Sequence, residues 1–225
     1  MKRIFFVTAL MLVFAQVCFA ATSTLNRSDA DSQARQSFEL RAVDGKFFDV
    51  RIVGDNEKLV TDWFRAPNDD IWTGNYSAYL GDANSDTFTR QDVELFADDL
   101  DKNYPQRINV TRDNRDGFYV VRGVNNLPDL LVSKIQITSF AFAVKIFVVK
   151  DGRLQPVNFQ NDKGTLQDNR DSDFRPITYL DDGTISLTWH TNTVPDVGTY
   201  ATVYMLDADN LILIPAYTKN IWSPQ

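Results

Sequence analysis

Four Asp-Gly pairs divide this chain into short segments in which apolar and polar residues alternate. The pairs are Asp44-Gly45, Asp116-Gly117, Asp151-Gly152 and Asp182-Gly183. Asp-Gly tolerates the positive φ that tight hairpin turns need, and alternation is typical of a strand with one buried face. The sequence therefore predicts a mainly β fold, an antiparallel two-sheet β-sandwich.

The segments on either side of the first Asp-Gly pair show how the turn sets the register. Apolar residues alternate with polar ones before the turn at Phe38, Leu40 and Ala42, and after it at Phe48, Val50 and Ile52. A three-residue connection over 44–46 places both apolar sets on one face of the sheet. A two-residue loop would place them on opposite faces, because one step of register turns every side chain over.

Two further features refine the strand prediction. Residues 131–150 form the longest strand-like stretch, and its apolar residues change phase near Thr138-Ser139. That change predicts a β-bulge, or a bend where one strand passes between two sheets. Pro215 falls within the last apolar run and cannot donate a hydrogen bond to a neighbouring strand, which predicts an edge strand there.

One short α-helix is predicted at about residues 90–103. Thr89 and Asp92 have the spacing of a capping box, with Thr89 as the N-cap. Val93, Phe96 and Leu100 then give one apolar stripe at helical spacing. Tyr104-Pro105 would end the helix.

The N-terminus has the pattern of a secretory signal peptide over residues 1–20. A basic start is followed by an apolar run and by small residues at Cys18 and Ala20. Cleavage after Ala20 is expected, because the run is short for a membrane span and the residues before Cys18 match a lipidation signal poorly. The protein is thus expected to be exported, to the periplasm or the extracellular space. Residues 21–37 read as a flexible polar arm and residues 38–225 as a single β-rich domain.

Composition limits the partners and the chemistry. Cys18 is the only cysteine, so the mature chain would be free of disulfides, and its roughly 200 residues suffice for one sizeable core. Loss of Lys2 and Arg3 takes the formal charge from −7 to −9. This charge argues against nucleic acid and anionic membranes as partners, and no membrane insertion is expected after cleavage. The sequence leaves the oligomeric state open.

Most catalytic apparatus is missing from the chain. His190 is the only histidine, so a Ser-His-Asp triad would have to use it and a multi-histidine metal site within one chain is excluded. There is no Gly-x-Ser-x-Gly nucleophile elbow. A carboxylate pair, as in glycoside hydrolases, is the apparatus that remains, but with 30 acidic residues the sequence nominates no pair. No catalytic residue is assigned.

Two acidic segments are candidate cation sites. Asp82, Asn84 and Asp86 alternate as in the start of a calcium loop. However, Thr87 occupies the position of the usual glycine, and Asp92 falls one place short of the usual acidic ligand, so a polar turn is favoured and no cofactor is expected. The second segment, residues 160–175, holds Asp168, Asp171 and Asp173. It is either a functional or a disordered loop, and its acidic residues are expected to be solvated.

An aromatic cluster is the strongest candidate for a binding site. Its members, interleaved with Asp and Asn, are Trp63, Trp72, Tyr76 and Tyr79. Exposed aromatic rings could stack on sugars or anchor a protein partner, whereas buried ones would belong to the core. The sequence thus suggests an exported non-catalytic binding or structural protein whose partner is a glycan or a protein. The alternative is a secreted carboxylate-based hydrolase.

Overall fold

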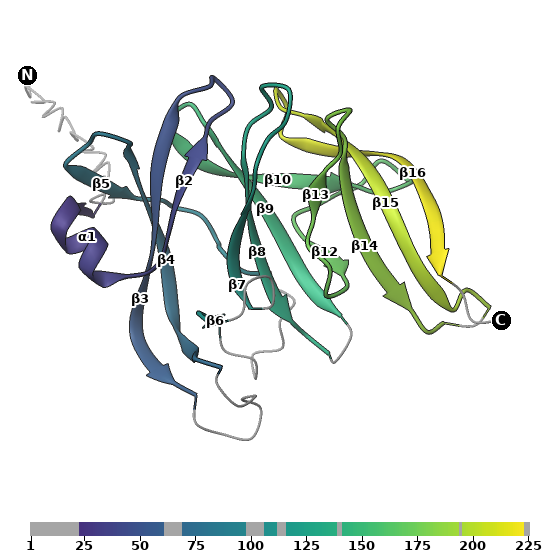
Figure 1. The fold of residues 1–225 in the computed structure, drawn as a ribbon, viewed down its shortest axis with the longest axis horizontal. Coiled ribbons are helices and arrows are strands. Elements are labelled where there is room, and N and C mark those ends of the chain that lie inside the picture. The colour runs from purple at the N-terminus through teal and green to yellow at the C-terminus, as the bar shows by residue number, and fades with distance from the viewer. Residues whose placement is uncertain are drawn as a thin grey trace, which may run out of the picture.

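The computed structural model describes residues 23–60, 69–97, 106–111, 116–138, 141–193 and 195–222. Within these ranges the chain is mainly β, and its strands form two sheets that pack together like a sandwich (Figure 1). The pairing is antiparallel except between β10 and β16. The predicted fold class is therefore confirmed. That residues 38–225 form a single domain stays a prediction, and the predicted signal peptide, residues 1–20, lies outside the described residues.

The smaller sheet has the order β1-β5-β4-β3-β2, with β6 beside β4. Its strands are β1 (Thr24–Asn26), β2 (Ala34–Arg41), β3 (Phe47–Leu59), β4 (Ile71–Asp82), β5 (Thr87–Arg90) and β6 (Arg107–Asn109). In the β2–β3 hairpin Leu40 lies opposite Phe48 and Phe38 opposite Val50, so both apolar sets face the core. The prediction that both apolar sets lie on one face is confirmed. The predicted register is wrong by two residues: a connection over 44–46 would place Ala42 opposite Phe48, but the Ala42 N–H donates to the Lys46 carbonyl, so the turn closes one residue earlier.

The larger sheet has the order β13-β14-β15-β16-β10-β9-β8-β7, with β11 beside β10 and β12 beside β9. Its strands are β7 (Gly117–Val121), β8 (Leu130–Gln136), β9 (Phe142–Lys150), β10 (Arg153–Gln160), β11 (Leu166–Gln167), β12 (Arg170–Ser172), β13 (Thr178–Tyr179), β14 (Ile185–Thr191), β15 (Gly198–Asp207) and β16 (Ile212–Trp222). Asp151-Gly152 and Asp182-Gly183 form hairpin turns, as predicted. Asp116-Gly117 does not, because β6 and β7 belong to different sheets.

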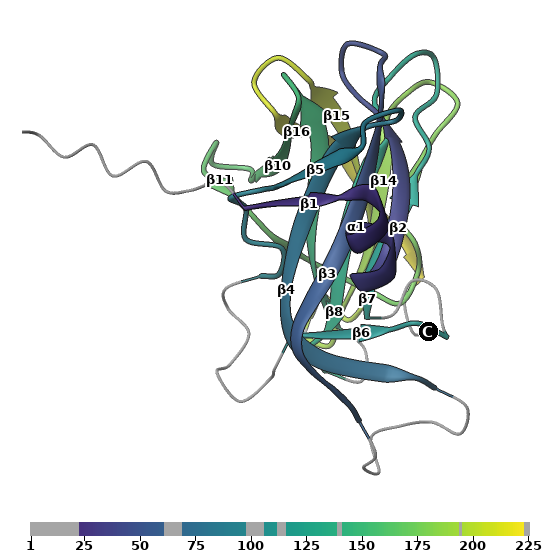
Figure 2. The same cartoon turned by 90° about the vertical axis from the view of Figure 1, so that its left-hand side faces the viewer.

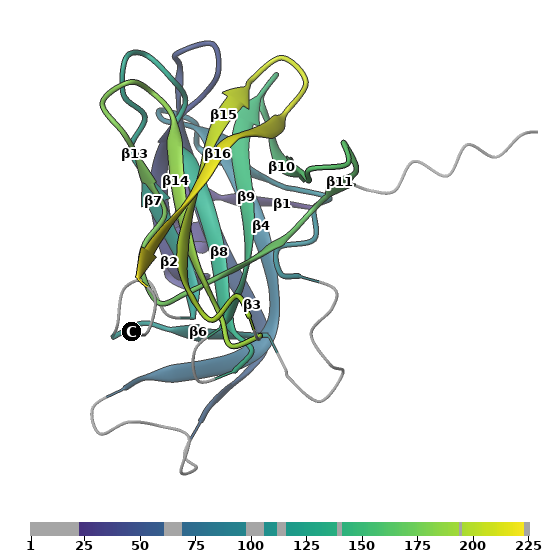
Figure 3. The same cartoon turned by 90° about the vertical axis from the view of Figure 1, so that its right-hand side faces the viewer.

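Strand β10 folds the larger sheet over on itself. It pairs with β9 as far as Val157, after which Asn158 and Phe159 pair with β16 instead, while β12 takes the place beside β9. As a result β7–β9 lie between the β2–β4 group and the β14–β16 group (Figures 1 and 3). One core cluster lies on each side of this middle layer, with Phe147 in one and Ile146 in the other.

The phase change within residues 131–150 marks a turn, in which the Ile137 and Thr138 N–H groups donate to the Ala141 carbonyl. The segment is two strands, β8 and β9, and eight of the nine β9 residues are buried. The prediction of one bent strand is therefore wrong. The strand that changes partners is β10, which leaves β9 for β16 after Val157 within the larger sheet.

The predicted flexible arm is ordered in its described part, residues 23–37. These residues form β1, helix α1 (Arg27–Gln33) and the start of β2 (Figure 2). Leu25 pairs with Phe88 of β5, the Asn26 side chain caps the helix, and Ala30 is fully buried. The polar composition of the segment predicted flexibility. The segment is ordered because it packs on strands that come later in the chain.

The helix predicted at residues 90–103 is wrong over residues 90–97, and residues 98–103 lie outside the described part. Thr89, the predicted N-cap, is in β5 and pairs with both Thr24 and Leu80. Three consecutive residues, 95–97, are buried, which one helical stripe would not produce. Among the described residues, no helix is long and apolar enough to cross a membrane.

Candidate binding surfaces

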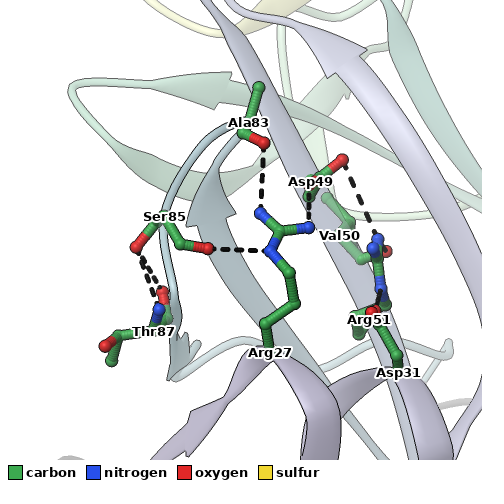
Figure 4. A network of polar contacts seen from close by, with 8 residues as sticks. All are labelled: Arg27, Asp31, Asp49, Val50, Arg51, Ala83, Ser85 and Thr87. Carbon is green, nitrogen blue, oxygen red and sulfur yellow. Dashed lines mark hydrogen bonds and ion pairs between the residues drawn. The ribbon is translucent and has the colours of Figure 1, made fainter.

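The predicted calcium loop is the turn between β4 and β5, and its carbonyl oxygens bind an arginine (Figure 4). Arg27, at the start of α1, donates from Nη2 to the Ala83 carbonyl at 3.1 Å and from Nε to the Ser85 carbonyl at 3.0 Å. Its Nη1 pairs with Asp49 at 2.9 Å. Backbone carbonyls are among the ligands of a calcium loop, and here a guanidinium holds two of them.

The three predicted metal ligands do not converge. The side chains of Asp82, Asn84 and Asp86 are exposed. No group of three or more His, Cys, Asp or Glu residues within the described ranges could hold a metal ion. The hydrogen bonds from Arg27 to the Ala83 and Ser85 carbonyls therefore hold this turn.

Replacing Arg27 with Met should lower the free energy of unfolding by roughly 1–3 kcal/mol, because one charged and two neutral acceptors lose their donor. Urea denaturation measures this loss, and Arg153→Met, at an exposed site, should change little. Calcium and a chelator should give the wild-type protein the same melting temperature. A rise of several degrees with calcium would contradict the assignment of this turn to Arg27.

The structure does not gather the predicted aromatic residues into one open face. Tyr76 is in the core, and its hydroxyl donates to the Trp72 carbonyl at 3.0 Å. Trp72 is half-buried, with the Arg35 guanidinium 3.9 Å from its ring centroid. Tyr79 is also half-buried, and Trp63 lies outside the described residues. Sugar stacking on this cluster gains no support from the arrangement.

Arg35 is held over Trp72 by a two-point ion pair. Its Nε and Nη2 donate to the two carboxylate oxygens of Glu57, at 2.9 and 2.5 Å. Burial, together with the negative charge of Glu57, raises the pKa of the Tyr76 hydroxyl above its ordinary value. The hydroxyl is therefore neutral throughout the physiological range, as suits a core residue.

The acidic residues of the 160–175 segment have separate structural roles. Asp168 pairs with the buried Lys145 at 2.8 Å. Asp173 is buried and accepts hydrogen bonds from the Thr188 hydroxyl at 2.6 Å and the Arg175 backbone N–H at 2.8 Å. Asp171 is exposed on β12. The segment is ordered by its strands β11 and β12, and its carboxylates do not form one cation site.

His190 lies on β14 with both ring nitrogens in hydrogen bonds. Its Nδ1 is 3.0 Å from the Thr199 hydroxyl and its Nε2 is 2.9 Å from the Asn192 side-chain oxygen. Neither partner is a serine or a carboxylate, so the residues around His190 do not form a Ser-His-Asp triad.

A groove of about 1790 Å³ opens between the β4–β5 end of the smaller sheet and the β9–β10 hairpin. Phe47, at the start of β3, lines it with 48% of its surface exposed. Amides line it at Asn84, Gln91 and Gln155. Its charged residues are Asp44, Asp82, Asp92, Asp151, Lys46, Arg90 and Arg153. The lining thus combines hydrogen-bond donors and acceptors with one exposed aromatic ring.

Sequence reasoning missed this groove as a site. Its lining comes from three distant segments, residues 44–48, 80–92 and 151–156, which only the packing of the sheets brings together. The one signal was Phe47, which falls outside the buried phase of its strand. Comparisons of the chain with profiles of known protein families, with curated proteins and with solved structures found no match.

Proposed function

We propose that the protein is a non-catalytic binding protein and that the groove beside Phe47 holds a glycan. The exposure of Phe47 among seven charged side chains is the observation that supports this most directly. Sugars combine apolar ring faces with many hydroxyl groups. An exposed aromatic ring can cover the former, while carboxylate, amide and guanidinium groups bind the latter.

We also propose that the protein acts outside the cytoplasm. The signal-peptide pattern of residues 1–20 supports export to the periplasm or the extracellular space. Oligosaccharides of envelopes and matrices are met in these compartments. The carboxylate-based hydrolase is the competing function, and four carboxylates in the same groove favour it over other enzyme classes.

The exported protein should bind a soluble polysaccharide, and Phe47→Ala should weaken that binding at least about tenfold, as expected for loss of a stacking anchor. Intact mass should first show a chain that begins at Ala21. Affinity electrophoresis against a panel of polysaccharides then measures binding. Phe174→Ala is the matched control, because Phe174 is 63% exposed and does not line the groove.

Two outcomes would change the proposal. Equal retardation of both phenylalanine variants, or no retardation by any polysaccharide, would remove the groove as a glycan site. Release of new reducing ends from a bound polysaccharide would replace the binding protein by the hydrolase. In that case Asp→Asn variants at the groove carboxylates would identify the pair.

A further inference from the structure

The outer edge of β16 has backbone groups without partners. On one side β16 pairs with β15 along most of its length, as far as Trp222. On the other side its pairing with β10 ends at Leu213. Within the described part of the chain, the backbone of residues 214–222 makes no other hydrogen bond to a backbone group or a side chain. Pro215 lies in this stretch, which agrees with the edge position predicted for it.

Side chains bind backbone groups at two other sheet edges, those of β7 and β2. The Gln36 amide accepts from the Phe118 N–H at 3.0 Å and donates to the Phe118 carbonyl at 3.2 Å, which covers the edge of β7. Arg122 donates to the Glu39 carbonyl on β2 at 2.8 Å. Such coverage prevents pairing with another chain, and an uncovered edge is a template for it.

The uncovered edge also carries exposed apolar side chains. Tyr217, Ile221 and Trp222 on β16 are 52%, 40% and 53% exposed, and Met205 on β15 is 50% exposed. Lys219 is the only charged residue among residues 214–222. Solvent-facing edges usually carry several charges, and a contiguous apolar patch marks an interaction surface.

There is room for a further strand beside this edge. After Gln160 the chain turns away from β16, with the Gly164 N–H donating to the Asn161 carbonyl at 2.9 Å. A hollow of about 420 Å³ separates that turn from residues 214–218. A strand added to β16 would enter this hollow, which the 160–164 turn lines on the side away from β16.

We propose that this edge pairs with β16 of a second copy of the chain, antiparallel and about a two-fold axis at Thr218. The reflection places Ile214 opposite Trp222 and Tyr217 opposite Lys219 of the other copy. Aliphatic–aromatic and cation–aromatic pairs are favourable across an antiparallel ladder. An axis one residue later would place the two copies of Lys219 opposite each other, which is unfavourable.

The self-complementary pattern is what selects a second copy as the occupant. Each edge supplies one cation, Lys219, and each Lys219 meets a tyrosine of the other copy. No like charges therefore lie face to face at the joined strands, although each chain is acidic overall. A two-fold interface of this kind uses the same patch twice and closes as a dimer. None of its residues lines the groove, so dimerisation and glycan binding are separable.

A single cysteine tests the axis directly. Cys18 is the one cysteine of the sequence, so in a protein that begins at Ala21 the Thr218→Cys variant has a single thiol and should give a disulfide-linked dimer under mild oxidation on a non-reducing gel. Asp86→Cys is the control, because Asp86 is exposed in the β4–β5 turn of the smaller sheet and this variant should remain monomeric on that gel. Sedimentation of the wild-type protein should show a reversible dimer.

A charge exchange tests the pairing. Tyr217→Lys places two ammonium groups opposite each other and should weaken the dimer about tenfold or more, while Tyr217→Lys combined with Lys219→Glu should restore it. Because Tyr217 is exposed, the melting temperature of the Tyr217→Lys monomer should equal that of the wild-type monomer, measured at a protein concentration low enough to dissociate the dimer. A wild-type monomer at all concentrations would overturn the proposal, as would a dimer indifferent to Tyr217→Lys. Cross-linking of Thr218→Cys to another protein would also overturn it, in favour of a foreign strand.

Discussion

Tyr76→Ala is expected to lower the free energy of unfolding by about 3–5 kcal/mol. Tyr76 is 7% exposed, and its ring centroid lies 6.1 Å from that of Phe96 in the core between the sheets. Truncation leaves a cavity there and removes the hydrogen bond to the Trp72 carbonyl. Urea denaturation monitored by far-ultraviolet circular dichroism measures the loss.

The control for this variant is Tyr76→Phe, which keeps the ring and removes only the hydroxyl. It should cost about 1 kcal/mol, the usual net contribution of one hydrogen bond. The pair of variants separates packing from polar contacts. If Tyr76→Ala were as stable as the wild type and lost a ligand instead, Tyr76 would be the exposed anchor of the sequence hypothesis and its buried position would be contradicted.

Local turn chemistry made the hairpins predictable. At Asp151-Gly152 both turn residues have positive φ, 52° and 67°, which Asp-Gly tolerates better than most pairs. The shared buried face of β2 and β3 followed from the alternation on both sides of Gly45, although the exact register did not. These features depend on residues that are close in sequence, so a single chain reveals them.

Elements that depend on distant partners were not predictable in the same way. Thr89 has the pattern of a helix N-cap, but it also pairs with β1 and β4. The strand forms instead of the helix because this pairing buries Phe88 completely. The polar segment before Phe38 forms a helix because Arg27 pairs with Asp49 on β3 and lies over the Phe88 ring on β5, and because Ala30 is buried. Nothing near these residues in the sequence signals such contacts.

The candidate sites show the same division. The sequence located an oxygen-rich turn at residues 82–86 but could not show that Arg27, more than fifty residues earlier, supplies the cation. It located aromatic residues but not their burial. The groove and the edge of β16 arise from the path of β10, which joins the middle layer to the outer one. Surfaces that depend on topology require the folded chain.

Lys134→Met is expected to raise the free energy of unfolding at pH 7 by about 2 kcal/mol. Lys134 is 1% exposed, and its Nζ makes a hydrogen bond to the Arg175 carbonyl at 3.0 Å. Burial lowers the pKa of its ammonium group from 10.5 to about 8, although Asp173 and Asp116 oppose the shift. A shift of this size corresponds to about 3 kcal/mol, and loss of the hydrogen bond offsets about 1 kcal/mol.

The pH dependence gives the same prediction a second measurement. Because the pKa of Lys134 is lower in the folded state, the unfolded chain binds more protons between about pH 8 and pH 10.5. The contribution of Lys134 to stability therefore rises with pH across that window and is least favourable below it. The urea midpoints of wild type and Lys134→Met should differ at pH 7 and should lie close together at pH 10. Lys46→Met, at an exposed position, should show no such convergence. If Lys134→Met were less stable than wild type at pH 7, the prediction would be wrong. The attraction of the Lys134 ammonium group to Asp173 and Asp116 would then exceed the cost of burying its charge.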